Sequence, residues 1–153
     1  MNATHPLTTP HLVNWLGYGG LVPFVFFAVA TCVAPGYLVF YERALLTYGA
    51  VILSFVGALH WGFAMTLQRL STTQRQQAYA WSVVPALLAW LALLLEPATW
   101  ASFLVVAGFL GNYWRDVCLA RLATLPNWYL PLRLRLTAVA CVCLLALPAA
   151  TVL

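Results

Sequence analysis

The stretch Tyr41–Arg69, YERALLTYGAVILSFVGALHWGFAMTLQR, is the part of the chain from which the fold class follows most directly. Positions 44–67 contain no charged residue. A helix over this segment would be about 36 Å long at 1.5 Å per residue, which is enough to cross the roughly 30 Å hydrocarbon core of a bilayer with some tilt. The stretch therefore predicts a transmembrane helix, and the other segments are interpreted around it.

Small residues recur at every fourth position of this helix and would stack along one face: Ala50, Ser54, Ala58 and Gly62. Small side chains at this spacing allow a second helix to approach closely within lipid. On a neighbouring face, Gly57 precedes His60, the only histidine inside an apolar segment, by about one turn. We expect this ladder of small residues and Gly57 to pack against protein rather than lipid.

The composition excludes a water-soluble domain. The 153 residues are 64% apolar and 7% charged, with a mean hydropathy of +0.91, whereas soluble domains are about half apolar and about a quarter charged. We therefore treat residues 1–153 as a single membrane domain. Arginines between apolar segments supply the positive charge, so membrane topology explains it better than a nucleic-acid partner, and we predict none.

The apolar segments predict an all-α membrane bundle of five transmembrane helices, near residues 13–34, 42–67, 78–95, 98–119 and 132–153. The side that carries the N-terminus and the second and fourth loops holds six arginines, and the other side holds only Arg43: the six are Arg69, Arg75, Arg115, Arg121, Arg133 and Arg135. The positive-inside rule then places the N-terminus in the cytoplasm and the C-terminus outside.

The first eleven residues contain no Lys or Arg. Because signal peptides and mitochondrial presequences carry basic residues, we expect the first span to be retained. This predicts a multi-pass protein of the bacterial inner membrane, with an imported protein lacking its presequence as the alternative.

Polar residues from every span would lie in the inner third of the bilayer. In the structural interpretation, the arginines extend to the headgroups and the aromatic residues form an interfacial belt. In the functional interpretation, ionisable residues within spans indicate a site, here a pocket around His60 open to the inner leaflet. The candidate ligand-binding residues are His60, Trp61, Trp81, Ser82, Asn112 and Arg115.

Asp116 requires a partner at this depth, because an unpaired carboxylate there would be protonated or hydrated. Arg115 is about 100° away on the same helix and does not face it. Arg133, across the short fourth loop, is the expected partner, with Arg121 as the runner-up. We predict an Asp116–Arg133 ion pair that joins spans four and five.

Several site chemistries find no support in the sequence. There is no HExxH motif and no Walker loop. A bis-histidine haem would need a second histidine facing His60, and the other two histidines are in the N-terminal tail. The four cysteines are interpreted as packing residues. A catalytic set of Ser54 or Ser82 with His60 and Asp116 is conceivable but unsupported. We assign no catalytic residue and no metal ligand, and leave a bound lipid or quinone as the cofactor class to test.

Four stretches resemble the transmembrane-protein-69-like family: Leu16–Phe24, Tyr48–Met65, Trp81–Leu95 and Leu125–Thr137. The patterns YGAVILSFxGxxHWG and LPxWYxxLR carry most of the likeness. The resemblance implies a small multi-span protein of a bacterial or mitochondrial inner membrane with no established activity. It singles out as motif positions His60, Trp61, Pro85, Trp128, Tyr129 and Arg133.

Two functions of different class follow from these observations. The first is an accessory or assembly subunit that packs against a larger membrane complex, which the small-residue ladder favours. The alternative is a carrier or binding protein for a lipid- or quinone-like amphipathic molecule, which the residues around His60 favour. An enzyme acting on such a molecule is a weaker third hypothesis. An accessory subunit would have a filled interior. A protein that binds a lipid or quinone would have an aromatic-lined cleft that reaches His60.

Overall fold

The structure, a computed structural model, describes residues 11–150. This part of the chain is helical and contains no strand, which confirms the all-α prediction. Its elements are α1 (His11–Gly19), α2 (Val22–Val33), the 3-10 helix η1 (Pro35–Tyr37), α3 (Leu38–Thr66), α4 (Thr72–Leu93), α5 (Ala98–Leu122) and α6 (Tyr129–Ala150).

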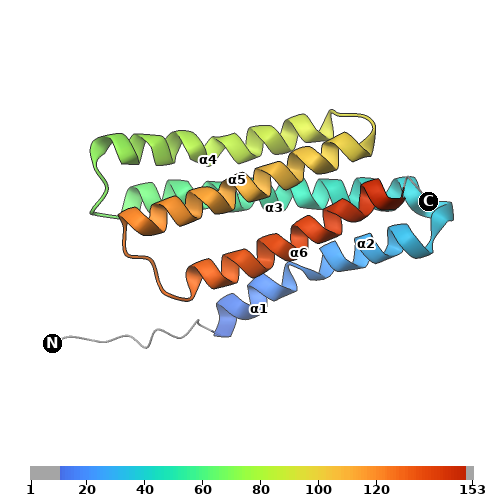
Figure 1. Cartoon of the computed structure of the whole chain (residues 1–153), viewed down its shortest axis with the longest axis horizontal. Helices are drawn as coiled ribbons and strands as arrows, with labels where there is room; N and C mark the ends of the chain where they lie inside the picture. Colours follow the sequence, from blue (N-terminus) through green and yellow to red (C-terminus); the bar gives the residue numbers. More distant parts are fainter. Residues whose placement is uncertain (1–10, 151–153) are drawn as a thin grey trace.

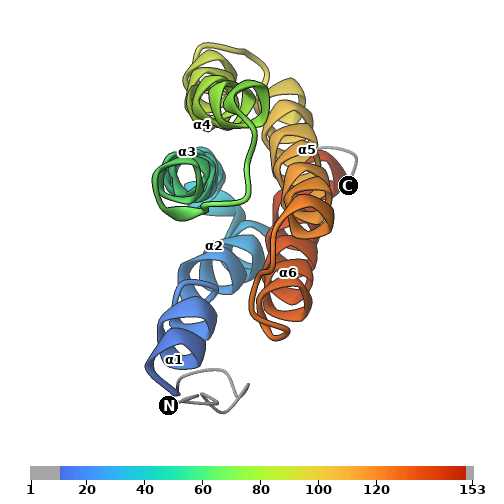
Figure 2. The same ribbon diagram turned by 90° about the vertical axis from the view of Figure 1, so that its left-hand side faces the viewer.

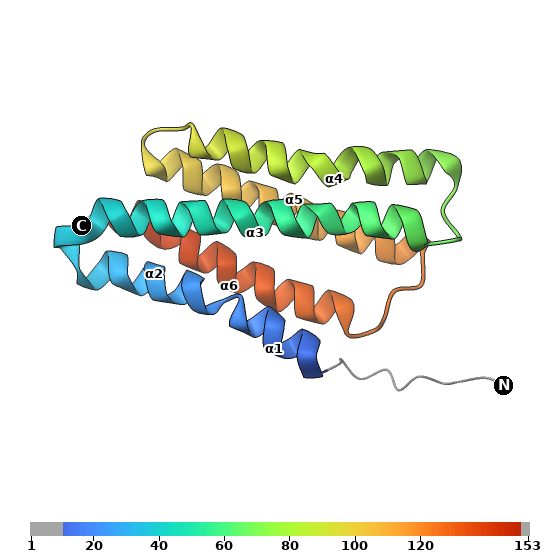
Figure 3. The same ribbon diagram turned by 180° about the vertical axis from the view of Figure 1, so that it is seen from behind.

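The long helices lie side by side in two rows (Figures 1 and 2). One row contains α4, α3 and the α1–α2 segment, and the other contains α5 and α6. Helix α3 is central, since it packs against α2, α4, α5 and α6. Figure 3 shows α3 running along the middle of the bundle from behind. This position agrees with the stretch from which the fold was predicted.

Three helical segments among the described residues are long and apolar enough to cross a membrane: His11–Val33, Leu38–Thr66 and Tyr129–Pro148. Helices α4 and α5 have 22 and 25 residues, so they have the length of a span. Polar residues in the first turns of α4 and the last turns of α5 make them less apolar. Crossing by α4 and α5, and the orientation of the bundle, remain predictions.

The two ends of the bundle differ in charge. Helices α3 and α5 end, and α4 and α6 begin, at the same end (Figure 1). We call this the arginine-rich end because six of the seven arginines lie on or beside these helix termini. At the opposite end, Arg43 and Glu96 form an exposed ion pair with 3.9 Å between Nη2 and Oε1.

The first predicted span is two helices rather than one. α1 ends at Gly19 and α2 begins at Val22, with Pro23 in its first turn. A proline removes one helical hydrogen bond and crowds the carbonyl four residues earlier, which breaks the preceding turn. The Tyr48 hydroxyl of α3 donates to the carbonyl of Gly20 at 2.8 Å, so the break is also held from outside.

Helix α4 begins before its predicted start. The sequence suggested a loop over residues 68–77, but the helix starts at Thr72. Ser71 and Gln74 form a capping box, in which each side chain accepts a hydrogen bond from the other residue's backbone N–H. The guanidinium of Arg75 donates to the carbonyls of Ala64 and Leu67, which closes the α3–α4 turn.

Only part of the small-residue ladder is buried within the chain. Ala50 is buried and Ser54 is half-buried, whereas Ala58 and Gly62 are exposed. The expectation that all four face protein is therefore not met by contacts within this chain. Gly57 does pack closely, since a Cβ there would lie 2.7 Å from the Cβ and Cγ of Pro85 on α4.

Candidate functional site

Asp116 is the centre of a buried polar cluster near the arginine-rich end. Its carboxylate is fully buried on α5. Arg133 Nε donates to Oδ2 at 2.9 Å, and the Tyr129 hydroxyl donates to Oδ1 at 3.1 Å. The Nε2 atom of His60 lies 3.6 Å from the same Oδ1. The structure thus brings together Asp116 and Arg133, the two residues that the sequence paired, and adds side chains from α3 and α6.

A short loop between α5 and α6 brings the residues of this cluster together. Residues 123–128 join α5 to α6, so the last turns of α5 face the first turns of α6. Tyr129 and Arg133 are four residues apart and share one face of α6. In the structural interpretation of the sequence, Tyr129 would be one of the aromatic residues of an interfacial belt, and its bond to Asp116 was not predicted. The spacing of Tyr129 and Arg133 was the signal that could have identified it.

A cavity of about 120 Å³ lies beside this cluster, between α1, α2, α3, α5 and α6. Its wall is mainly apolar and includes Phe24, Ile52, Val56 and Phe109. Gly17, in the last turn of α1, and Gly20, in the α1–α2 break, also line it. Two of its lining side chains, Leu16 and Phe55, are exposed at the surface of the bundle. The cavity therefore opens sideways, toward the space that a bilayer would occupy.

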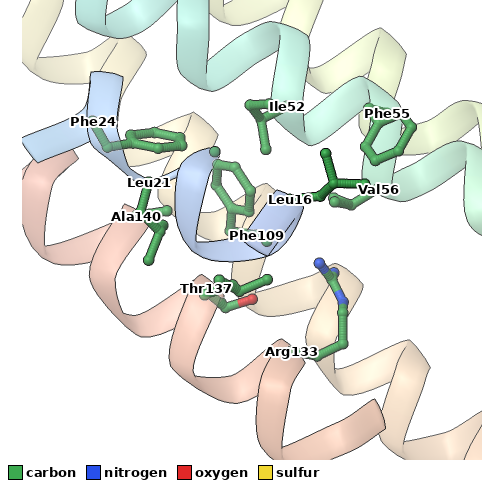
Figure 4. Close-up of a pocket in the computed structure, with 13 residues that line it drawn as sticks. Leu16, Leu21, Phe24, Ile52, Phe55, Val56, Phe109, Arg133, Thr137 and Ala140 are labelled. Carbon is green, nitrogen blue, oxygen red and sulfur yellow. The ribbon is translucent and has the colours of Figure 1, made fainter. Parts of the chain in front are cut away.

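Two residues that line this cavity each have a buried polar atom with no hydrogen-bond partner: Arg133 Nη2 and Thr137 Oγ1. Arg133 is 6% exposed and Thr137 is 3% exposed. Figure 4 shows the guanidinium of Arg133 extending from α6 toward Val56 and Leu16, with Thr137 one turn further along the same helix. Because buried polar groups are nearly always paired, these two atoms are candidate hydrogen-bonding groups for a ligand.

A second, smaller cavity of about 40 Å³ lies next to His60. Gln74 and Gln77 of α4 and Arg115 and Cys118 of α5 also line it. Both imidazole nitrogens of His60 and the Nε atom of Arg115 are buried without a hydrogen-bond partner. Asp116 contacts both His60 and Arg133, so it connects the smaller cavity with the larger one.

The six predicted ligand-binding residues do not form one pocket. Trp81 Nε1 donates to Asn112 Oδ1 at 3.2 Å, and the guanidinium of Arg115 lies 5.3 Å from the centre of the Trp81 ring. The Ser82 hydroxyl donates to the carbonyl of Tyr79 at 2.6 Å, which satisfies it within α4. The Trp81 contacts join α4 to α5, whereas the Ser82 bond stays within α4. They support the structural interpretation of three of the six residues: Trp81, Ser82 and Asn112.

The other three predicted residues lie elsewhere. Trp61 is half exposed and packs edge-on against Tyr79, with 4.9 Å between ring centres. His60 and Arg115 line the smaller cavity, and none of the six lines the larger one. The larger cavity was missed because it depends on the break between α1 and α2 and on the side-chain packing around it. A ligand role for His60 and Arg115 remains a prediction.

Comparisons with known proteins identify the family but no activity. Residues 9–149 match the family model described as "Protein of unknown function (DUF3429)". Transmembrane protein 69 of Xenopus tropicalis is 40% identical over 132 residues, which cover 86% of this chain and 51% of the relative. The chain thus spans about half the length of this curated relative. No solved structure matches it. The chain belongs to the transmembrane-protein-69-like family of proteins of unknown function, DUF3429.

Proposed function

We propose that this protein is a multi-pass protein of the bacterial inner membrane that binds a lipid- or quinone-like amphipathic molecule in the cavity beside Arg133. The observation that carries the proposal is the pair of unpartnered polar atoms, Arg133 Nη2 and Thr137 Oγ1, in an otherwise apolar cavity. Leaving a buried donor or acceptor unsatisfied costs about 1–3 kcal/mol. A ligand headgroup that bonds to both atoms would recover this free energy.

The size and opening of the cavity suit one part of such a molecule. An apolar cavity of about 150 Å³ admits benzene, and the 120 Å³ cavity is somewhat smaller, which suits a headgroup of a few atoms. The rest of the ligand would extend past Leu16 and Phe55 into the bilayer. Helix α1 packs on α6, which leaves its side toward α3 as the entrance.

This proposal relocates the binding site predicted from the sequence. The predicted pocket surrounded His60. The larger cavity instead has Arg133 and Thr137 of α6 as its polar lining residues. His60 remains coupled to it through Asp116, which lies 3.6 Å from His60 and 2.9 Å from Arg133. His60 would therefore influence the headgroup site through Asp116 and would not contact the ligand itself.

Native mass spectrometry of the protein purified in mild detergent tests the proposal. We expect the wild type to retain an amphipathic molecule, and Thr137→Val to retain several-fold less, because valine keeps the shape of threonine and removes the hydroxyl. Thr66→Val is the matched control, since Thr66 is exposed and its hydroxyl donates only to the carbonyl of Gly62. Equal retention by wild type and Thr137→Val, or no retained molecule and no binding of added amphiphiles, would contradict it.

A second candidate function is an accessory subunit of a larger membrane complex. The observation in its favour is the exposed half of the small-residue ladder, Ala58 and Gly62, on the outer face of α3. A Cβ at Gly62 would meet nothing within 4 Å in this chain, so a helix of another subunit could approach there. Gly62→Leu should release stoichiometric partners in native gels without lowering the melting temperature of the isolated protein. An unchanged complex, or the absence of any partner in the wild type, would exclude this role.

A further inference from the structure

We infer that the cavity beside Arg133 takes the ionised headgroup of an anionic amphiphile, and that binding this anion is coupled to protonation of His60. The inference rests on the proposed function and adds the charge of the ligand and the group that compensates it. It follows from three observations: the donors in the cavity, the balance of charge around it, and the position of His60 relative to Asp116.

The headgroup site offers hydrogen-bond donors. The unpartnered Nη2 of Arg133 carries only N–H groups, so its partner must be an acceptor. The hydroxyl of Thr137, one turn away, has no partner and could donate to an acceptor placed between the two. Charge-assisted bonds from a guanidinium to an anionic oxygen are stronger than those to a neutral carbonyl. The chemistry of the site therefore favours a carboxylate, sulfonate or similar anion.

The charge around the site also favours an anion. The chain has three acidic residues, and only Asp116 lies near the arginine-rich end. The other two, Glu42 and Glu96, lie at the opposite end, where Glu96 pairs with Arg43. Asp116 pairs with Arg133 beside the cavity, while Arg115 lines the smaller cavity next to His60. An entering anion therefore meets no carboxylate other than Asp116.

Binding of an anion would nevertheless disturb a balanced pair. Arg133 and Asp116 neutralise each other, and both are buried. A ligand anion that shares Arg133 leaves two negative groups on one guanidinium in a medium of low dielectric constant, which is unfavourable without a further positive charge. The cluster needs a group that becomes positive when the ligand enters.

His60 is placed to supply that charge. Its Nε2 lies 3.6 Å from Asp116 Oδ1, so a small rotation of the ring would form a charge-assisted hydrogen bond once the imidazole is protonated. The proton would come from hydronium or a buffer acid: the N–H bond forms at His60 Nε2 as the donor's bond to that proton breaks, and water or the buffer base is left. Asp116 would then be held by His60 and Tyr129 while Arg133 engages the ligand.

The other groups that face His60 do not replace it in this role. From α5 these are Asp116, Arg115 and Cys118, and from α6 they are Arg133 and Tyr129. The arginines are already charged, and the Tyr129 hydroxyl already donates to Asp116. From α4 the cavity-lining side chains are the neutral Gln74 and Gln77, while Arg75 bonds to the carbonyls at the end of α3.

The smaller cavity provides a route for the proton. A water molecule requires roughly 10–15 Å³ of such space and two to four polar partners. The 40 Å³ beside His60 has that room, and Gln74, Gln77 and Arg115 supply partners. This cavity lies toward the arginine-rich end, so His60 would exchange its proton on that side while the ligand enters from the bilayer.

Calorimetry of the full chain in phosphatidylcholine nanodiscs tests the coupling. The probe is dodecanesulfonate, which stays ionised at every working pH, so any proton taken up goes to the protein. Titrations in buffers of different ionisation enthalpy, corrected with empty nanodiscs, count these protons. We expect one proton per bound probe, and a Kd that rises about tenfold per pH unit where His60 is neutral in the free protein. Dodecanol, with the same chain and no charge, should bind at least tenfold more weakly and take up no proton.

Variants separate the coupling from binding itself. His60→Gln should bind the sulfonate more weakly, without proton uptake and with a Kd independent of pH. Thr137→Val should weaken binding and leave the proton count at one. Arg135→Gln, which removes an exposed arginine two residues from Arg133, is the control and should change neither quantity. If His60→Gln does not fold, the proton count of the wild type decides the question.

The outcomes distinguish failure of the inference from failure of the proposed function. Binding of the sulfonate without proton uptake, or an unchanged pH dependence in His60→Gln, would overturn the coupling while leaving a binding site. Equal affinity for dodecanol would overturn the anionic headgroup and favour a neutral acceptor. No binding of either probe to the wild type would overturn the inference together with the proposed function.

Discussion

Asp116 carries the largest expected energetic effect of any single side chain in the described bundle. It is fully buried, and three side chains from two other helices converge on it: His60, Tyr129 and Arg133. Removing one partner of a buried ion pair is strongly destabilising, because the remaining charge is left uncompensated. The pair joins α5 to α6, and His60 extends the contact to α3.

We predict that Asp116→Asn lowers the free energy of unfolding by about 3–5 kcal/mol, because it leaves Arg133 buried without a counter-charge. Glu96→Gln is the control, since the exposed Glu96–Arg43 pair is worth at most about 1 kcal/mol. Thermal unfolding in detergent measures both. The Asp116→Asn, Arg133→Gln double variant should lose little more than either single variant. Additive losses would show that the two residues act independently.

The sequence predicted this pair but not its surroundings. Depth in the span, helix geometry and the short fourth loop were sufficient to match Asp116 with Arg133. The cavity beside Arg133 was not predictable, because it arises where the α1–α2 break, the side chains of α3 and the face of α6 leave space between them. Periodicity specifies which face of a helix is apolar and does not specify how neighbouring helices fill the gap.

At the scale of elements, glycines set how closely α3 approaches its neighbours. Gly57 faces Pro85 of α4, and a Cβ there would lie at 2.7 Å. Gly108 of α5 faces Leu53 of α3 in the same way, with a Cβ placed 2.6 Å from Leu53 Cδ2. Leu53 has a flexible side chain that can move, whereas the ring of Pro85 is fixed to its backbone. The α3–α4 contact is therefore the stricter of the two.

We predict that Gly57→Ala destabilises the protein by about 1–3 kcal/mol, the usual effect of overpacking a well-packed contact. Gly62→Ala is the control on the same helix, because a Cβ there meets nothing within 4 Å. It should be neutral or stabilising by up to about 1 kcal/mol, since alanine favours helix more than glycine does. Melting temperatures in detergent compare the two variants. Equal melting temperatures would show that α3 and α4 are not in close contact at Gly57.

The bounds of the elements were predicted less well than their order, and the first of the five predicted spans is two helices, α1 and α2. The predicted spans 98–119 and 132–153 correspond to α5 and α6 with shifts of up to three residues at the described ends, and residues 151–153 lie outside the described part. Helix α4 extends six residues beyond the N-terminal bound of span 78–95, because its polar first turns carry no apolar period and its capping box was not recognised. Pro23 in the sequence indicates a kink in the first span, and the structure has a full break there, between α1 and α2.

At the scale of the whole molecule, charge and burial agree with a bundle inserted in one direction. Six arginines gather at one end, and the apolar exposed residues lie along the helices between the two ends. Exposed large side chains such as Phe55, Leu87, Trp90 and Val142 would face lipid. The positive-inside rule then predicts that the arginine-rich end faces the cytoplasm.

Cysteine labelling in bacterial spheroplasts tests this orientation. In a chain with the exposed Cys32 replaced by serine, we expect Gly36→Cys to react with a membrane-impermeant maleimide from outside. Thr124→Cys, in the loop between α5 and α6, should react only after the membrane is permeabilised. The reverse pattern would invert the topology. Labelling of both positions from outside would show that an even number of the helices α3, α4 and α5 cross the membrane, against the predicted three.

The central claim is that the cavity beside Arg133 receives an amphiphile from the bilayer, and site-mapped photo-crosslinking tests it most directly. A dodecanoic acid that carries a diazirine near its carboxylate would be irradiated with the protein in nanodiscs, and the adducts located by peptide mass spectrometry. We predict adducts on the cavity-lining residues Val56, Leu136 and Thr137, reduced several-fold in Thr137→Val and unchanged in Thr66→Val. Adducts confined to exposed residues such as Trp90 and Trp100, with none in the cavity, would contradict the account.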